Sequence, residues 1–175
     1  LKENRQRAYD DFIAVAEDLV ARKVTSPRHL GIRGGSNGGL LTGVMLTQRP
    51  DLWGAVVVQV PLLDMKRFNK LLAGASWMAE YGDPDTDDWN YIREYSPYHN
   101  LEEDAEYPKA FFTTSTRDDR VHPAHARKMV AKMTDMGKPV YYYENTEGGH
   151  AAGANLNQQA YMWSLSYAYL WKMLR

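Results

Sequence analysis

The sequence predicts an α/β fold in which a mostly parallel sheet of about four strands is flanked by helices. Short apolar runs alternate with amphipathic helical segments along the chain, and one run, residues 55–60, consists mainly of valine. Strands that are separated by helices pair in parallel, and a parallel sheet is buried on both faces. The 175 residues contain no repeat, low-complexity tract or linker, so we expect a single domain.

The first helix is expected over residues 7–23. Apolar residues recur there at spacings of three and four, which predicts one buried face. That face would hold Phe12, Val15, Ala16 and Leu19.

The remaining elements follow in alternation. Strands are expected over residues 29–34, 55–60, 110–114 and 140–143. Helices are expected over residues 37–47, 123–136 and 155–175. Helical spacing predicts that the last helix buries one side, which would hold Met162, Leu165, Tyr169 and Met173. The stretch 61–108 is expected to be irregular, with short helices and many aromatic residues.

Composition excludes several classes of protein. Lys and Arg number 21 against 22 Asp and Glu, so the net charge of −1 argues against nucleic-acid binding through overall charge. No stretch approaches the roughly 18 apolar residues of a membrane helix. The chain has no cysteine, which rules out a disulfide framework, a thiol nucleophile and a Cys-ligated zinc site. We therefore expect neither nucleic acid nor a membrane as a partner.

A serine stands at the junction between the first strand and the next helix. Gly34-Gly35-Ser36-Asn37-Gly38 has the pattern G-x-S-x-G in the strand-to-helix context of a nucleophile elbow. A sharp turn there lifts the serine hydroxyl above the sheet, and small residues at Gly34 and Gly38 let strand and helix pass closely. The amide of Asn37 would lie at a helix N-terminus, where it can stabilise an oxyanion. The simpler interpretation is a glycine-rich turn with an incidental serine.

Two other glycine-rich sites do not fit this segment. A P-loop needs Lys and Ser or Thr after its second glycine, whereas Leu40 and Leu41 follow Gly39. A dinucleotide-binding fingerprint would need glycine in place of Ser36.

A serine nucleophile needs a base, and the base needs an orienting acid. In hydrolases with this elbow, the acid and then the histidine follow the serine along the chain. Asp118 and Asp119 come just after the third expected strand, and His150 follows the fourth in a glycine-rich loop. Either aspartate could be the acid; the alternative for both is a surface carboxylate paired with Arg117 or Arg120.

The remaining titratable clusters predict no metal site. His122 and His125 are spaced i, i+3, but no third ligand is evident nearby, so capping or solvent-facing roles are preferred. The acidic run 83–88 fits several calcium-loop positions, but its sixth position is Asp88 where the loop requires glycine. The weaker candidates for the base are His29, His99, His122 and His125.

Together, these motifs resemble the C-terminal part of the peptidase domain in the prolyl oligopeptidase family of serine peptidases. The resemblance extends over essentially the whole chain, and a set of motifs in order is far more specific than one elbow. The matching segments are Tyr9-Asp10-Asp11-Phe12, Thr25-Ser26-Pro27, Gly34-Gly35-Ser36-Asn37-Gly38-Gly39-Leu40-Leu41, Tyr95-Ser96-Pro97, Asp118-Asp119-Arg120-Val121 and Gly149-His150.

The resemblance implies a partial α/β-hydrolase fold and a set of catalytic roles. Ser36 would be the nucleophile, Asp118 the acid and His150 the base. The reaction would need no cofactor and no metal.

The resemblance also implies a pocket for proline. Trp77 would stack on the proline ring of the substrate, and Arg120 would hold a substrate carbonyl, while Tyr81 and Val121 would line the pocket. Independently, a flat indole suits a rigid apolar ring, and an arginine fork suits carbonyl oxygens. The alternative for Trp77 is a core aromatic side chain.

Parts of the family's architecture are expected to lie outside this sequence, which starts at Leu1. Residues 1–175 would lack the β-propeller that restricts access to small peptides and the first strands of the hydrolase sheet. Those strands would supply a tyrosine hydroxyl as a second oxyanion donor, and loss of one such donor costs about 10²–10³ in turnover. The strand ending at Gly34 would have an unpaired edge, so we expect self-association or a need for the upstream segment.

Two functions follow as hypotheses. The first is a serine peptidase that hydrolyses short peptides after proline through an acyl-enzyme, or that acts on other peptides or esters with the same residues. The second is a non-catalytic fragment that folds or oligomerises without turnover.

Overall fold

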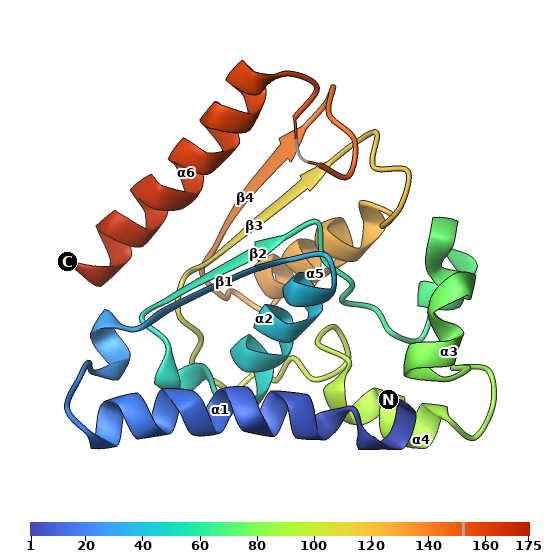
Figure 1. Cartoon of the computed structure of the whole chain (residues 1–175), viewed down its shortest axis with the longest axis horizontal. Helices are drawn as coiled ribbons and strands as arrows, with labels where there is room; N and C mark the ends of the chain where they lie inside the picture. The colour runs from blue at the N-terminus through green and yellow to red at the C-terminus, as the bar shows by residue number, and fades with distance from the viewer. Residues whose placement is uncertain (152) are drawn as a thin grey trace.

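The computed structural model describes residues 1–151 and 153–175 and contains one four-stranded parallel sheet (Figure 1). The strand order β1-β2-β3-β4 follows the chain order. Gly31 pairs with Ala55, and Ala110 pairs with Val140, which sets the register. The predicted α/β fold class is confirmed. The strands are β1 (Gly31–Gly35), β2 (Ala55–Gln59), β3 (Ala110–Ser115) and β4 (Val140–Asn145).

Four long helices cover the sheet in two layers. One layer contains three helices, and α6 lies alone on the opposite face (Figure 1). The first layer consists of α1 (Gln6–Ala21), α2 (Asn37–Gln48) and α5 (Ala124–Asp135), and α6 spans Leu156–Leu174. No helix in the described part of the chain is long and apolar enough to cross a bilayer.

Short helical turns make up most of the remaining structure. As expected, the stretch between β2 and β3 is irregular, with only α3 (Met78–Tyr81) and α4 (Trp89–Ile92) as α-helical turns. The 3-10 turns are Lys2–Asn4, Pro27–His29, Pro50–Leu52, Phe68–Lys70, Leu72–Trp77 and Arg93–Tyr95. β1 begins two residues later than predicted because Pro27 starts one of these turns just before it.

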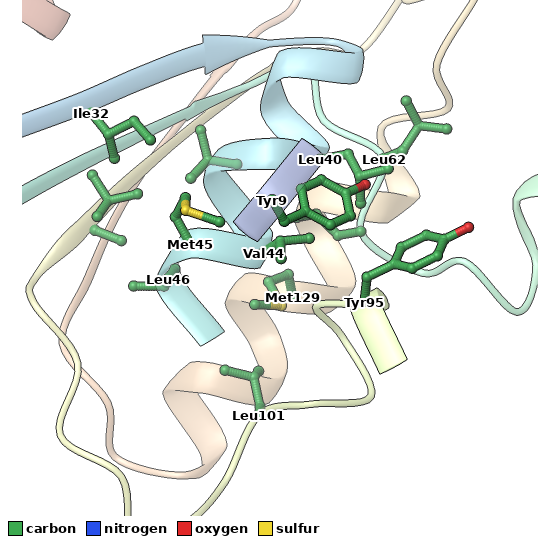
Figure 2. Packing of buried hydrophobic residues seen from close by; sticks show 14 of the residues in the cluster. Tyr9, Ile32, Leu40, Val44, Met45, Leu46, Leu62, Tyr95, Leu101 and Met129 are labelled. Atoms are coloured by element: carbon green, nitrogen blue, oxygen red, sulfur yellow. The ribbon is translucent and has the colours of Figure 1, made fainter. Parts of the chain in front are cut away.

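Alternation along the strands separates two hydrophobic clusters. In β2, Val56 and Val58 contribute to the large cluster under α2 and α5, while Ala55 and Val57 face Tyr169 of α6. Figure 2 shows how side chains from α1, α2 and α5 meet in the large cluster. The labelled members include Tyr9, Leu40, Val44, Met45, Tyr95 and Met129.

The predicted buried face of α1 is confirmed for Ala16 and for the half-buried Leu19 but is wrong for Phe12 and Val15. Phe12 is 41% exposed and Val15 is 58% exposed, whereas Tyr9 and Ala16 are buried. The helix carries two overlapping apolar stripes, and the stripe through Tyr9, Ile13 and Ala16 is the one that packs against the large cluster. The predicted face of α6 is confirmed, because Met162 and Tyr169 are buried, and Leu165 and Met173 are half-buried.

The sheet leaves β1 at an edge, with one side unpaired among the described residues. Two apolar surfaces flank that edge. The exposed stripe of α1 lines a groove with Leu30, Ile32 and Trp53. On the other face, the Arg33 guanidinium of β1 lies 3.6 Å from the centre of the Trp163 ring of α6. We call this combined region the β1-edge surface; its exposed apolar members are Phe12, Val15, Trp163, Tyr167 and Trp171.

Candidate active site

Ser36 occupies a strained turn between β1 and α2. Its backbone has φ +60° and ψ −117°, in the region that side chains other than glycine rarely adopt. The turn is held because the Ser36 amide donates to the Gln59 carbonyl over 2.9 Å, and the Leu40 amide donates to the Ser36 carbonyl over 3.0 Å. The structure therefore has the geometry of a nucleophile elbow at the position where the pattern predicts it.

The predicted role in close approach holds for Gly34 but not for Gly38. A side chain at Gly34 would collide with the backbone carbonyl of Gly38, so close approach requires Gly34. A side chain at Gly38 would contact nothing within 4 Å, so that glycine does not enable the close approach. The second tight position is Gly39, where a Cβ would lie 2.7 Å from the Gln59 carbonyl oxygen.

Three side chains from three strand ends meet above the sheet. The Ser36 Oγ lies 3.0 Å from Nε2 of His150, and Nδ1 of His150 lies 2.8 Å from Oδ2 of Asp118. The other oxygen of Asp118 accepts hydrogen bonds from the amides of Arg120, over 2.9 Å, and Val121, over 2.8 Å. Serine, histidine and aspartate thus form a continuous hydrogen-bonded chain, in the order that general-base activation of a hydroxyl requires.

Asn37 connects this chain to a second group of residues. Asn37 is the first residue of α2, where backbone N–H groups lack partners within the helix. Its side-chain Oδ1 accepts hydrogen bonds from Nη2 of Arg5, over 2.6 Å, and from the hydroxyl of Tyr81, over 2.7 Å. The backbone N–H of Asn37 therefore has no hydrogen-bond partner within α2, whereas the side chain of Asn37 accepts hydrogen bonds from two residues.

Comparison with known proteins decides the family. The prolyl oligopeptidase family matches residues 1–175. The chain belongs to the prolyl oligopeptidase family. This family and its named relatives are serine peptidases.

Individual relatives match nearly all of this chain. It is 62% identical over 175 residues to "Uncharacterized peptidase y4nA" of Sinorhizobium fredii (strain NBRC 101917 / NGR234), covering 99% of this chain and 24% of the relative. It is 40% identical over 165 residues to a prolyl endopeptidase of Dictyostelium discoideum, covering 90% of this chain and 22% of the relative. A solved structure of a post-proline cleaving enzyme from Rickettsia typhi matches with a TM-score of 0.94 and 41% identity, covering 99% of this chain and 25% of that one. The chain thus spans about a quarter of the length of these relatives.

The four residues predicted to bind substrate lie on segments that border the candidate site. Tyr81 and Val121 are almost fully buried, Trp77 is half-buried and Arg120 is exposed. The Tyr81 hydroxyl contacts the elbow, because it donates a hydrogen bond to Oδ1 of Asn37. Burial raises the pKa of that hydroxyl. The Trp77 segment touches the acid loop, since the Ala73 amide donates to the Arg120 carbonyl over 3.4 Å. The chain therefore brings the predicted pocket segments and the elbow together, while their role toward substrate stays a prediction.

His122 and His125 both accept hydrogen bonds from backbone amides, and the expected capping or solvent-facing role is wrong for His125. His125 is buried, and its Nδ1 accepts hydrogen bonds from the amides of Leu63, over 3.2 Å, and Asp64, over 3.1 Å. Burial lowers the pKa of His125 to about 4. His122 accepts a hydrogen bond from the Ala124 amide over 3.0 Å instead of sharing a ligand with His125. Among residues 1–151 and 153–175, no cluster of three or more His, Cys, Asp or Glu side chains could hold a metal ion.

The acidic run of residues 83–88 makes contacts that order its own loop. Asp83 and Asp85 accept hydrogen bonds from the side-chain Nδ2 of Asn69, and Asp85 also pairs with Lys70 at 3.0 Å. Asp88 accepts a hydrogen bond from the Asp83 amide over 2.9 Å.

Sequence reasoning missed two groups near the site. Arg5 and Glu80 form an ion pair beside Asn37, although 75 positions separate them and neither belongs to a recognised motif. Asp64 is buried and pairs with Lys128 and with Arg67, the latter at 3.3 Å. The Arg5 contacts connect sequence-distant segments, so no local pattern could have indicated them.

Proposed function

We propose that this chain carries the catalytic face of a serine peptidase, with Ser36 as nucleophile, His150 as base and Asp118 as orienting acid. The observation that carries the proposal is the continuous hydrogen-bonded chain of these side chains at the strained elbow. Membership in a family of serine peptidases supports it.

The proposed reaction has two halves. Nε2 of His150 takes the proton as the Ser36 Oγ attacks the carbonyl carbon of the substrate, and the Asn37 amide donates to the developing oxyanion. The imidazolium, stabilised by Asp118, then gives its proton to the leaving amine, and the acyl-enzyme remains. Water attacks this ester with His150 again as base, which releases the peptide acid and restores Ser36.

The proposed substrates are short peptides cleaved after proline. The indole of Trp77 suits the proline ring, the Arg120 fork suits a peptide carbonyl, and Tyr81 and Val121 would line the pocket. Relatives named prolyl endopeptidase support this preference. The alternative on the same machinery is hydrolysis of other peptides or of esters.

Hydrolysis rates of matched substrates distinguish cleavage after proline from a broader hydrolase activity. We expect hydrolysis of a chromogenic peptide with proline before the scissile bond to exceed that of matched peptides with arginine or alanine there, and to vanish in Ser36→Ala. Equal rates for the peptides, or a faster simple ester, would instead support the broader hydrolase.

A second candidate function is a fragment that folds without turnover. It is favoured by the unpaired edge of β1, next to the elbow, and by the fraction of the relatives' length that the chain spans. A fluorophosphonate probe distinguishes the two, because labelling that is lost in Ser36→Ala supports a working triad, whereas a folded chain that never labels supports the inert fragment.

We further propose that the β1-edge surface is covered by additional structure, either an upstream segment or a second copy of the chain. An exposed strand edge offers unpaired N–H and C=O groups to another strand. The exposed aromatic residues of α6 and the apolar stripe of α1 flank that edge on its two faces. Sedimentation at several concentrations tests the second-copy alternative, and a clean monomer at all of them would contradict it.

A further inference from the structure

One arginine connects three parts of the candidate site. Arg5 precedes α1 directly, and its side chain is only 14% exposed. Its guanidinium forms an ion pair with Glu80 of α3 through Nη1, and donates to Oδ1 of Asn37 over 2.6 Å through Nη2. Its Nε donates to the Tyr9 hydroxyl over 3.3 Å. Each of the three guanidinium nitrogens therefore donates one hydrogen bond, and a lysine ammonium could not reproduce these directions.

The acceptor on Asn37 is shared with the candidate proline pocket. The Tyr81 hydroxyl donates to the same Oδ1 over 2.7 Å. The Arg5 guanidinium also lies 5.1 Å from the centre of the Tyr81 ring, within the range of a cation–π contact. Arg5, Asn37 and Tyr81 thus contact one another pairwise, and α3 follows the turn that ends in Trp77 without a gap.

The position of Asn37 makes this triangle relevant to chemistry. The peptide unit between Ser36 and Asn37 carries the proposed oxyanion donor, and it belongs to a turn with an unfavourable backbone conformation. A hydrogen bond from a charged donor in a half-buried place is stronger than a neutral one, so Arg5 can restrain the Asn37 side chain. Restraint of that side chain limits rotation of the peptide unit that precedes it.

We propose that Arg5 is a positioning residue that, through Asn37 and Tyr81, aligns the oxyanion amide with the substrate pocket. The inference rests on the proposed serine-peptidase function. Because misplacement of a reacting group by about 1 Å can cost on the order of 10²-fold, we expect a loss between about tenfold and a hundredfold when Arg5 is replaced. The loss should fall mainly on kcat, because the oxyanion donor that Arg5 would align stabilises charge that develops in the transition state.

The main test measures the rate at which a fluorophosphonate labels Ser36 in the full chain. Arg5→Met removes the charge and keeps the stem, and Arg22→Met is its matched control, because Arg22 forms an exposed pair with Asp18 at the other end of α1. We expect labelling to slow at least tenfold in the first variant and to stay unchanged in the second. Equal rates in the two variants would overturn the proposal.

A double variant tests whether Arg5 acts through Asn37. Asn37→Ala keeps the backbone amide and removes the acceptor, so Arg5→Met should slow labelling little further in that background. Reductions that multiply would show that Arg5 acts by another route and would overturn the proposal. If Arg5→Met does not fold, Arg5→Lys replaces it, and we expect a partial loss of at least threefold with the same non-additivity.

Failure of the proposed function can be recognised separately. If the folded wild-type chain does not label, the peptidase proposal fails, and Arg5 is then judged by hydrogen exchange of the Asn37 amide measured by NMR. We expect that amide to exchange at least tenfold faster in Arg5→Met than in Arg22→Met, with amides of α5 unchanged. An unchanged Asn37 amide would overturn the positioning role.

Discussion

Asp118 and Asp119 are adjacent in the chain after β3, but their surroundings differ. Asp118 is buried and uses both oxygens, one on His150 and one on two backbone amides. Asp119 is exposed. The residues alone left both open as the acid, and the family resemblance favoured Asp118. The structure supports that proposal, because Oδ2 of Asp118 lies 2.8 Å from Nδ1 of His150.

Replacing the two aspartates should therefore give opposite results. In Asp118→Asn the new amide would donate toward Nδ1 of His150, which leaves the proton on Nε2 and blocks acceptance from Ser36. We expect the rate of peptide hydrolysis or fluorophosphonate labelling to fall about 10³–10⁴-fold, as in other triads. Asp119→Asn, the matched control, should stay within about twofold of wild type. Similar losses in both variants would contradict the assignment of the acid.

The buried imidazole of His125 makes stability depend on pH. Burial lowers the pKa of His125 to about 4 in the folded chain, below its ordinary value of about 6.5. On acidification, His125 takes up its proton at a higher pH in the unfolded chain than in the folded chain. The free energy of unfolding should therefore fall as pH drops from about 6.5 to about 4, and His125 contributes no further loss below pH 4. The shift corresponds to about 3 kcal/mol over the whole window.

Urea unfolding at several pH values checks this expectation. His125→Asn retains an acceptor for the amides of Leu63 and Asp64 but cannot titrate, so its free energy of unfolding should lose about 3 kcal/mol less between pH 7 and pH 4. His29→Asn is the control, because His29 is exposed. An unchanged slope in His125→Asn would contradict the buried neutral histidine.

The elements of this chain were predicted well wherever a local pattern specifies them. All four strands and the helices between them lie within a few residues of the predicted ranges, because short apolar runs and helical periodicity are local signals. The orientation of α1 was not predicted correctly, since its two apolar stripes overlap and tertiary packing selects the stripe through Tyr9. The Arg5–Asn37–Tyr81 contacts also escaped prediction, because they depend on how distant elements meet.

The turn between β1 and α2 provides a test with two neighbouring glycines. A methyl group at Gly34 would collide with the Gly38 carbonyl, so Gly34→Ala should destabilise the chain by roughly 3 kcal/mol or prevent folding. Gly38→Ala meets no neighbour and lies in α2, so we expect it to be neutral or to add up to about 1 kcal/mol. Urea unfolding of both variants measures the difference, and equal stabilities would contradict the described path of the elbow.

At the scale of the whole chain, the proposed active site lies close to an unpaired sheet edge. The elbow lies at the end of β1, the same strand whose outer side is unpaired among the described residues. Exposed aromatic residues are concentrated on α6 beside that edge, where Trp163 stacks on Tyr167 with ring centres 5.7 Å apart. Anything that covers the β1-edge surface would therefore also restrain the segment that carries Ser36.

Charges placed on this surface should weaken association of the chain with itself. If a second copy covers this surface, the wild type should form larger species at high concentration, whereas the double variant Phe12→Glu and Trp171→Glu should sediment as a monomer, because burying a charge opposes association. Leu156→Glu is the control, since Leu156 is exposed at the opposite end of α6. Association that is unaffected by the double variant, or reduced equally by the control, would contradict a role for this surface.

The most direct measurement is peptide mass spectrometry of the folded chain after reaction with a fluorophosphonate. If the hydroxyl of Ser36 is activated by His150 and Asp118, one label should be found per chain, on the peptide that contains Ser36. It should be absent from Ser36→Ala and strongly reduced in His150→Ala. A folded wild-type chain with no label, or with the label on a different residue, would contradict the proposed active site.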